Sequence, residues 1–153
     1  MKKIIYTRPD GGLSVVHPVI NTIGEAEGFT ESDALARALA KLPADAINPQ
    51  VVDADAIPAD RTFRNAWAAD GKNLTTDMDK AREIHKDTLR ELRAPKLALM
   101  DIEVRRAERA GNTEQVEALN AKYQLLLDVT SDPRIASAKT PETLKAVIPA
   151  ALE

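Results

Sequence analysis

The feature that most constrains this fold is a long stretch of helical periodicity that begins near Asp77. Its apolar residues recur every three or four positions and form one stripe, while charged residues fill the remaining positions. The stripe comprises Ala81, Ile84, Thr88 and Leu92, with His85 and Leu89 beside it. Pro95 interrupts the pattern, but the helical period resumes at Leu97. The sequence therefore predicts either a kinked helix or a new helix with Pro95 in its first turn.

A second helical pattern follows after a very short break. Gly111 is suited to a left-handed helix cap, and Asn112 or Thr113 can begin the next helix. A turn this short predicts an antiparallel hairpin of helices over 79–110 and 113–128. We expect its core to contain Ile84, Leu92, Leu97, Met100, Leu119, Tyr123 and Leu126, with Val116 on the same stripe. Leu99 and Ile102 do not fit the helical period of the main stripe. They would lie on a second face of the helix, where an exposed apolar patch could mark an interface.

The C-terminal stretch predicts one more short helix. Thr140 is a suitable N-cap, Pro141 suits the first helical turn, and Pro149 would end the segment. Leu144, Val147 and Ile148 would form its apolar side.

The first forty residues predict a β-hairpin and a helix. Strands are expected over 2–7 and 13–19, joined by the RPDGG turn that contains Gly11 and Gly12. Pro18 cannot donate a backbone hydrogen bond, which places the second strand at a sheet edge. After a loop over 21–28, Thr30 and Asp33 can cap a helix that ends before Pro43.

Residues 43–61 contain three prolines and no helical period, so we expect a surface connector in which 50–52 is the only strand candidate. Asp70-Gly71 then lies between two runs that could pair as a second hairpin. A helical turn that brings Phe63 and Trp67 together is the alternative, and the hairpin is favoured. The predicted fold class is α+β, with a small α+β domain over 1–76 and the helical hairpin plus a terminal helix over 77–153.

Composition excludes several classes of protein. The chain of 153 residues has no cysteine, which excludes disulfides, thiolate metal sites and a cysteine nucleophile. Its net charge of −3 gives no reason to expect binding to nucleic acid or to anionic lipid. The start of the chain lacks the apolar run of a signal peptide, and no window has the ~18 apolar residues of a membrane span.

No motif predicts catalysis, a cofactor or a metal ion. Glu83 and His85 would point to different sides of a helix, so they could not share a metal ion. His17 is expected in a strand, and His85 beside the apolar stripe of its helix. Asp53, Asp55 and Asp60 lack the glycine and glutamate of a calcium loop. Gly11-Gly12 lacks the lysine of a phosphate loop. We therefore expect a protein that is not an enzyme.

The stretch IPADRTFRNAW holds the only tryptophan of the chain and has two interpretations. Phe63 and Trp67 can be buried rings that join the β part to the helices, with Arg61 and Arg64 paired to acidic residues. Alternatively, tryptophan and arginine together are typical of a binding hot spot. Because a chain with only 3% aromatic residues needs its large rings for the core, the structural interpretation is favoured. The candidate protein-binding residues are Arg61, Phe63, Arg64, Trp67, Leu99 and Ile102.

Three segments carry a resemblance to a known group of proteins. They are ADRTFRNAW, DMDKAREIHKDTLRELRAPKLALMDIEVRRAERAGN and LLLDVTSDPRIASAKTPETLKAVIP. Over most of its length, and best over 57–149, the chain resembles small tail-region proteins of tailed bacteriophages and prophages. The second half is also similar to the helical hairpin of tail fibre assembly proteins, although their tryptophan-rich motifs are absent. The resemblance carries no functional residues.

The resemblance implies a tail-associated structural or chaperone-like assembly protein that acts by protein–protein binding. The expected partner is a tail or tail fibre protein of the phage, or a second copy of the chain, with neither nucleic acid nor membrane involved. The expected location is the host cytoplasm or the virion tail. The alternative is a phage-encoded inhibitor that binds a host protein or an anti-phage defence protein.

Overall fold

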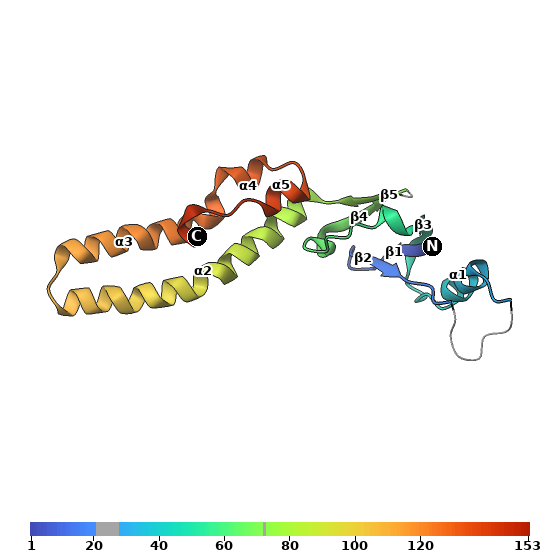
Figure 1. The fold of residues 1–153 in the computed structure, drawn as a ribbon, viewed down its shortest axis with the longest axis horizontal. Helices are drawn as coiled ribbons and strands as arrows, with labels where there is room; N and C mark the ends of the chain where they lie inside the picture. The colour runs from blue at the N-terminus through green and yellow to red at the C-terminus, as the bar shows by residue number, and fades with distance from the viewer. Residues whose placement is uncertain (21–27, 72) are drawn as a thin grey trace. The chain divides into compact units, whose positions relative to one another are not determined.

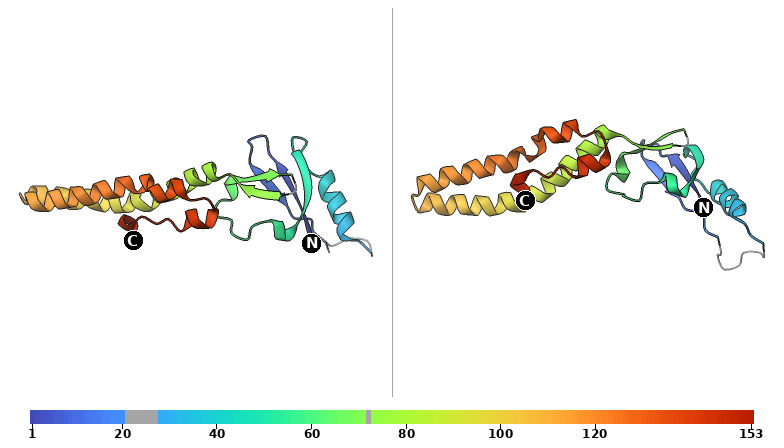
Figure 2. Two further views of the ribbon diagram at one scale, coloured as in Figure 1. Left: turned by 90° about the horizontal axis from the view of Figure 1, so that it is seen from above. Right: turned by 45° about the horizontal axis from the view of Figure 1, so that its top comes forward.

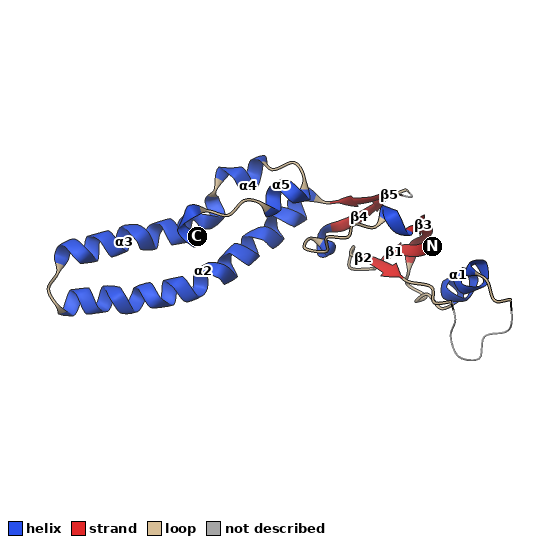
Figure 3. Cartoon of the chain, in the orientation of Figure 1, coloured by secondary structure: helices blue, strands red, loops and turns tan. Residues whose placement is uncertain are grey.

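The chain has an α+β fold and divides into two compact units, Met1–Asp77 and Met78–Glu153. The structure is a computed structural model that describes residues 1–20, 28–71 and 73–153. The predicted loop over 21–28 therefore lies, except for Gly28, outside the described residues. Figure 3 shows strands in the first unit and long helices in the second. The predicted fold class is confirmed.

The first unit contains a three-stranded antiparallel sheet with the strand order β2-β1-β3. The central strand β1 (Lys2–Thr7) pairs with β2 (Leu13–Val16) and with β3 (Ile47–Asp53), as Figure 1 shows. Ile4 and Ile5 of β1 are both fully buried, although neighbouring strand residues point to opposite faces. Both faces of this strand are therefore covered.

The predicted first hairpin is confirmed, with a shorter second strand. Gly11 has a φ of +78°, which glycine adopts without strain, and the amide of Arg8 donates to the carbonyl of Gly12 at 2.8 Å. Strand β2 ends at Val16, three residues earlier than predicted, so His17 lies beyond the strand. The edge position that Pro18 indicated for this strand is also confirmed.

Helix α1 (Glu31–Ala40) begins where its sequence predicts. Thr30 and Asp33 form a capping box, in which the amide of Thr30 donates to Asp33 Oδ2 at 2.8 Å and the amide of Asp33 donates to Thr30 Oγ1 at 3.3 Å. These two bonds satisfy amides that the first helical turn leaves without partners.

The strand candidate at 50–52 is confirmed, but the strand is longer than predicted and belongs to the sheet, so the expectation of a surface connector was wrong for 47–53. Ile47–Asp53 forms strand β3, followed by the short 3-10 turn Ala54–Ala56. Pro49 is tolerated because β3 is an edge strand, whose outer side needs no ladder hydrogen bond. Side-chain periodicity could not reveal the full length of this strand because only Val52 is buried, and its extent depends on backbone pairing with β1.

The predicted second hairpin is confirmed. After the 3-10 turn Arg64–Ala66, strand β4 (Trp67–Asp70) pairs with β5 (Asn73–Thr76), and Trp67 lies opposite Thr76. Trp67 packs with Ile5, Leu13 and Val52 in the core of the first unit. The Trp67 side chain thus shares this core with residues from all three strands of the larger sheet.

The second unit is built on the predicted helical hairpin. Helix α2 (Met78–Arg109) continues through Pro95 as one helix, and its ribbon changes direction along its length in Figure 1. Helix α3 (Thr113–Leu127) follows and lies beside α2 (Figure 2). Gly111 has a φ of +66°, and the side chain of Asn112 accepts from the amide of Gln115 at 3.1 Å. Both cap predictions are confirmed.

A segment of short helices follows α3 and covers the beginning of α2. It comprises the 3-10 turns Asp128–Ser131 and Ala150–Leu152 and helices α4 (Pro133–Ser137) and α5 (Pro141–Lys145). The N-cap Thr140 is confirmed, whereas α4 was not predicted. The segment buries Val129, Ile135, Leu144 and Val147, while Ile148 is exposed, contrary to its predicted place on the apolar side.

The buried face of α2 lies beside the predicted stripe. Ala81, His85 and Leu89 are buried, whereas Thr88 and Leu92 are exposed. Of the predicted hairpin core, Leu119 and Leu126 are buried, and four residues are half-buried: Ile84, Leu97, Met100 and Tyr123. The prediction that Leu92 is buried was wrong, because Leu92 is 52% exposed although it lies on almost the same side of α2 as the buried His85. Packing of the C-terminal segment and of α3 against α2 determines which residues of α2 are buried.

Candidate protein-binding sites

The candidate residues fall into two groups, one in each unit. Phe63 and Trp67 are buried in the first unit, with about one-twentieth of each side chain exposed (4% and 5%). Arg61 and Arg64 are exposed beside them. In the second unit, Leu99 and Ile102 are exposed on α2, by 64% and 47%. The expectation of two buried rings is confirmed, and Leu99 and Ile102 are exposed, as expected for residues off the main stripe.

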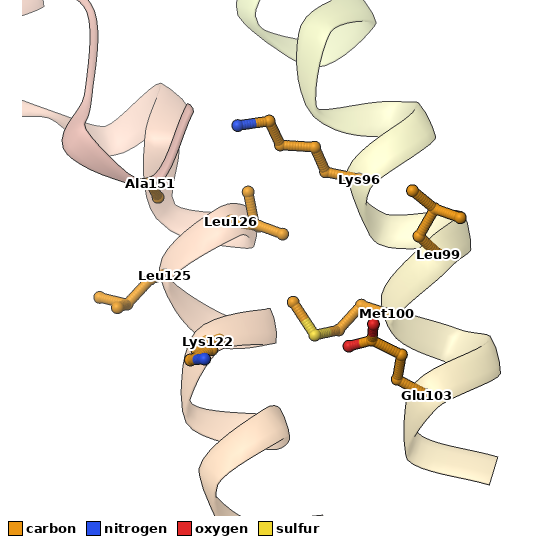
Figure 4. Close-up of a pocket in the computed structure, with 8 residues that line it drawn as sticks. All are labelled: Lys96, Leu99, Met100, Glu103, Lys122, Leu125, Leu126 and Ala151. Atoms are coloured by element: carbon orange, nitrogen blue, oxygen red, sulfur yellow. The ribbon is translucent and has the colours of Figure 1, made fainter. Parts of the chain in front are cut away.

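An apolar groove lies between α2 and α3 in the second unit. Its volume is about 370 Å³, and Figure 4 shows the residues that line it. The lining residues are Lys96, Leu99, Met100, Glu103, Lys122, Leu125, Leu126 and Ala151. Met100 and Leu126 point toward each other between the helices, while Leu99 and Leu125 lie at the outer sides. The groove thus offers an apolar floor between two exposed leucines.

The groove continues a face of α2 that other parts of the unit cover. At the beginning of α2, His85 contacts the backbone of Val147, and Arg82 donates to the carbonyl of Ala138 at 2.9 Å. Leu92 and Leu99 follow His85 at seven-residue steps, so they project from almost the same side of the helix. The covered part of this side is buried, and its continuation at Leu92 and Leu99 is exposed.

The end of the covering segment is held at the groove by Lys96. The ammonium of Lys96 donates to the carbonyls of Leu152 and Glu153, at 2.7 and 3.1 Å. Ala151 therefore forms one end of the groove. The charged rim consists of Lys96, Lys122 and Glu103, which provides both signs of charge around an apolar floor.

Only part of this groove was predictable from the sequence. The structure places Leu99 in the lining but not Ile102. It also exposes Leu125 by 61%, which the sequence analysis did not single out. A usable signal was the run of three leucines over 125–127, because consecutive helical residues point in different directions and cannot all face α2.

A small cleft of about 210 Å³ lies in the first unit beside β2. Nine residues line it: Tyr6, Arg8, Leu13, Ser14, Val15, Val16, Arg61, Arg64 and Trp67. The cleft thus brings together Arg61, Arg64 and Trp67, three of the candidate protein-binding residues. It adds Arg8, which the sequence analysis did not single out. Phe63 is buried and is not among the lining residues.

The cleft is cationic. Arg8 pairs with Asp10 at 3.1 Å, and the amide of Gly12 and the Arg8 guanidinium together lower the pKa of the Asp10 carboxyl. Within the described ranges, no carboxylate forms an ion pair with Arg61 or Arg64. Of the two alternatives for these arginines, charges that stay in water or pairing with acidic residues of the 53–60 loop, the structure has the first.

The acidic residues of that loop have other partners. Asp53 accepts from the ammonium of Lys2 at 2.6 Å, and Asp60 accepts from the amide of Thr62 at 2.9 Å. The hydrogen bond from Lys2 lowers the pKa of the Asp53 carboxyl. Both carboxylates thus support the local fold.

The two histidines lie in different units of the chain. His85 is buried, and its Nε2–H donates to the carbonyl of Val147 at 2.9 Å, since a carbonyl can only accept. Burial and the nearby charges of Lys3 and Arg61 lower the pKa of His17. Across the residues that the structure describes, no group of three or more His, Asp or Glu side chains could hold a metal ion.

None of the described helices is long and apolar enough to cross a membrane. Comparison of the chain with family models, with curated proteins and with solved structures finds no match.

Proposed function

We propose that this protein is a phage tail-associated structural or assembly protein that acts by binding another protein through its helical hairpin. The context comes from the resemblance of residues 57–149 to small tail-region proteins of tailed phages. The partner is a tail or tail fibre protein, and the protein has a structural or chaperone-like role.

The observation that carries the binding function is the apolar groove between α2 and α3. Leu99 and Leu125 are each more than half exposed, at 64% and 61%, on opposite sides of the groove. Exposed apolar side chains that gather around a groove are typical of protein-binding surfaces. A partner helix with apolar residues every three or four positions would fit between them, because its apolar face could cover both exposed leucines and the floor of the groove.

The test is affinity capture from phage-infected cells with the wild-type protein and two variants. Leu125→Glu places a charge in the groove, and we expect it to lose the captured tail protein. Ile47→Glu is a matched control because Ile47 is 52% exposed on β3, outside the groove, and this variant should capture the partner normally. Circular dichroism checks that both variants are folded.

The outcomes separate the main proposal from its alternative. Mass spectrometry should find a phage tail component in the captured material, and the protein itself in tail assembly intermediates or virions. Capture of a host protein alone, lost in the Leu125→Glu variant, would instead favour the phage-encoded inhibitor. Equal capture by both variants would contradict the use of the groove.

A further inference from the structure

We propose that the cleft beside β2 binds an extended acidic peptide, which pairs with the free edge of β2 and places its carboxylates on Arg61 and Arg64. The inference rests on the proposed function in one respect, that the ligand is a protein. It concerns a surface of the first unit, separate from the hairpin groove, and it names the chemistry of the segment that is bound there.

The cleft follows the edge of the strand. Leu13, Ser14, Val15 and Val16, which make up the whole of β2, all line it. Consecutive strand residues point to opposite faces of a sheet, so a cleft that contacts all four runs along the backbone edge. On the side of β2 away from β1, no described strand pairs with it. This edge therefore offers backbone groups to an incoming strand.

The charge of the cleft selects an acidic ligand. Arg61 and Arg64 lie beside β2 and form no ion pair with a described carboxylate. Arg8 adds a third guanidinium, although Asp10 already binds it. Arginine binds carboxylates through two parallel hydrogen bonds, and such charge-assisted bonds are stronger than those between neutral groups. Ser14 and Tyr6, whose side chains each carry a hydroxyl, also line the cleft.

A peptide fits this site better than a nucleic acid. Peptide amides and carbonyls can continue the ladder of β2, whereas a phosphate backbone offers no amide donors. The chain carries a net charge of −3, which opposes general attraction to nucleic acid. The bound segment should be extended and carry acidic side chains on one side.

Fluorescence anisotropy with a short labelled peptide of alternating valine and glutamate tests the proposal. This alternation places every glutamate on one side of an extended chain. The wild-type protein should bind it, and Arg61→Gln/Arg64→Gln should weaken binding on the order of tenfold or more, because two charge-assisted contacts are lost. The control Arg105→Gln/Arg106→Gln removes two exposed arginines of α2 and should leave the affinity unchanged.

Three further ligands distinguish the parts of the proposal. A valine–glutamine peptide should bind weakly if the carboxylates matter. A peptide with alternate amides N-methylated should also bind weakly if strand pairing matters. Oligothymidine should not compete.

The proposal would be overturned if the wild-type protein did not bind the glutamate peptide or if both double variants lost equal affinity. It would also be overturned if the N-methylated peptide bound normally, or if oligothymidine bound more tightly than the peptide through the same arginines. The Leu125→Glu variant should still bind the peptide. Failure of the cleft and failure of the hairpin groove are therefore separate results.

Discussion

The imidazole of His85 donates its Nε2–H to the backbone carbonyl of Val147, 2.9 Å away and 62 residues later in the chain. Both residues are buried, so neither group can exchange this bond for one to water. The bond attaches the segment after α5 to the first half of α2. It also explains how a polar side chain can occupy the buried stripe of this helix.

Replacing His85 with leucine should destabilise the protein by about 1–3 kcal/mol, because the carbonyl of Val147 loses its donor while it remains buried. His85→Gln is the matched control, since its side-chain amide can place a donor near the same position and should cost less. Urea denaturation followed by circular dichroism measures both effects. A leucine variant as stable as the wild type would show that the bond contributes nothing measurable.

Trp67 should report on the core of the first unit. Its side chain is 5% exposed and packs with Ile5, Leu13 and Val52, so its fluorescence should be blue-shifted and resist soluble quenchers. Trp67→Ala should lower stability by roughly 3–5 kcal/mol, and Trp67→Phe by less. Fluorescence typical of a solvent-exposed indole, together with a Trp67→Ala variant that melts normally but no longer binds the partner, would instead assign Trp67 to the contact surface.

Leu119 should contribute to the packing of α3 far more than Leu125 does. Leu119 is 8% exposed and Leu125 is 61% exposed, although both lie on the same helix. Leu119→Ala should therefore cost about 2–5 kcal/mol. Leu125→Ala should change stability by less than about 0.5 kcal/mol. Similar losses for the two variants in urea denaturation would contradict the packing of the hairpin.

Asp132 should make stability depend on pH in the acidic range. The guanidinium of Arg134 donates to its carboxylate at 2.7 Å and lowers the pKa of Asp132 below its ordinary value of 3.8. Because the folded pKa is the lower one, this stabilisation is complete above pH 3.8 and is lost as the pH falls through the folded pKa.

Asp132→Asn isolates this effect because asparagine can still cap α4 but carries no charge. We expect the variant to be less stable than the wild type at neutral pH, and the difference to shrink as the pH falls below 3.8. Urea denaturation of both proteins at several pH values measures the difference, in which the other acidic groups cancel. A difference that stays constant with pH would exclude the pair as its cause.

Local chemistry made part of the candidate sites predictable. The rarity of aromatic residues indicated that Phe63 and Trp67 are buried, and helical period indicated that Leu99 and Ile102 are exposed. The arginine cleft could not be predicted in full. Arg8 lies more than fifty positions before Arg61, and only the folded chain places both beside β2.

The sequence by itself determined the elements whose signals are local. The capping box of Thr30 and Asp33, the left-handed turn at Gly111 and the two β-hairpins depend on residues only a few positions apart, so short-range chemistry is enough to specify them. Tertiary structure decided three other features: the extension of the strand candidate at 50–52 to Ile47–Asp53, the burial of His85 but not of Leu92, and the open groove beside Leu125. Each of these features depends on a contact with a distant part of the chain. The local sequence pattern is the same whether or not that contact forms, so the pattern alone could not decide them.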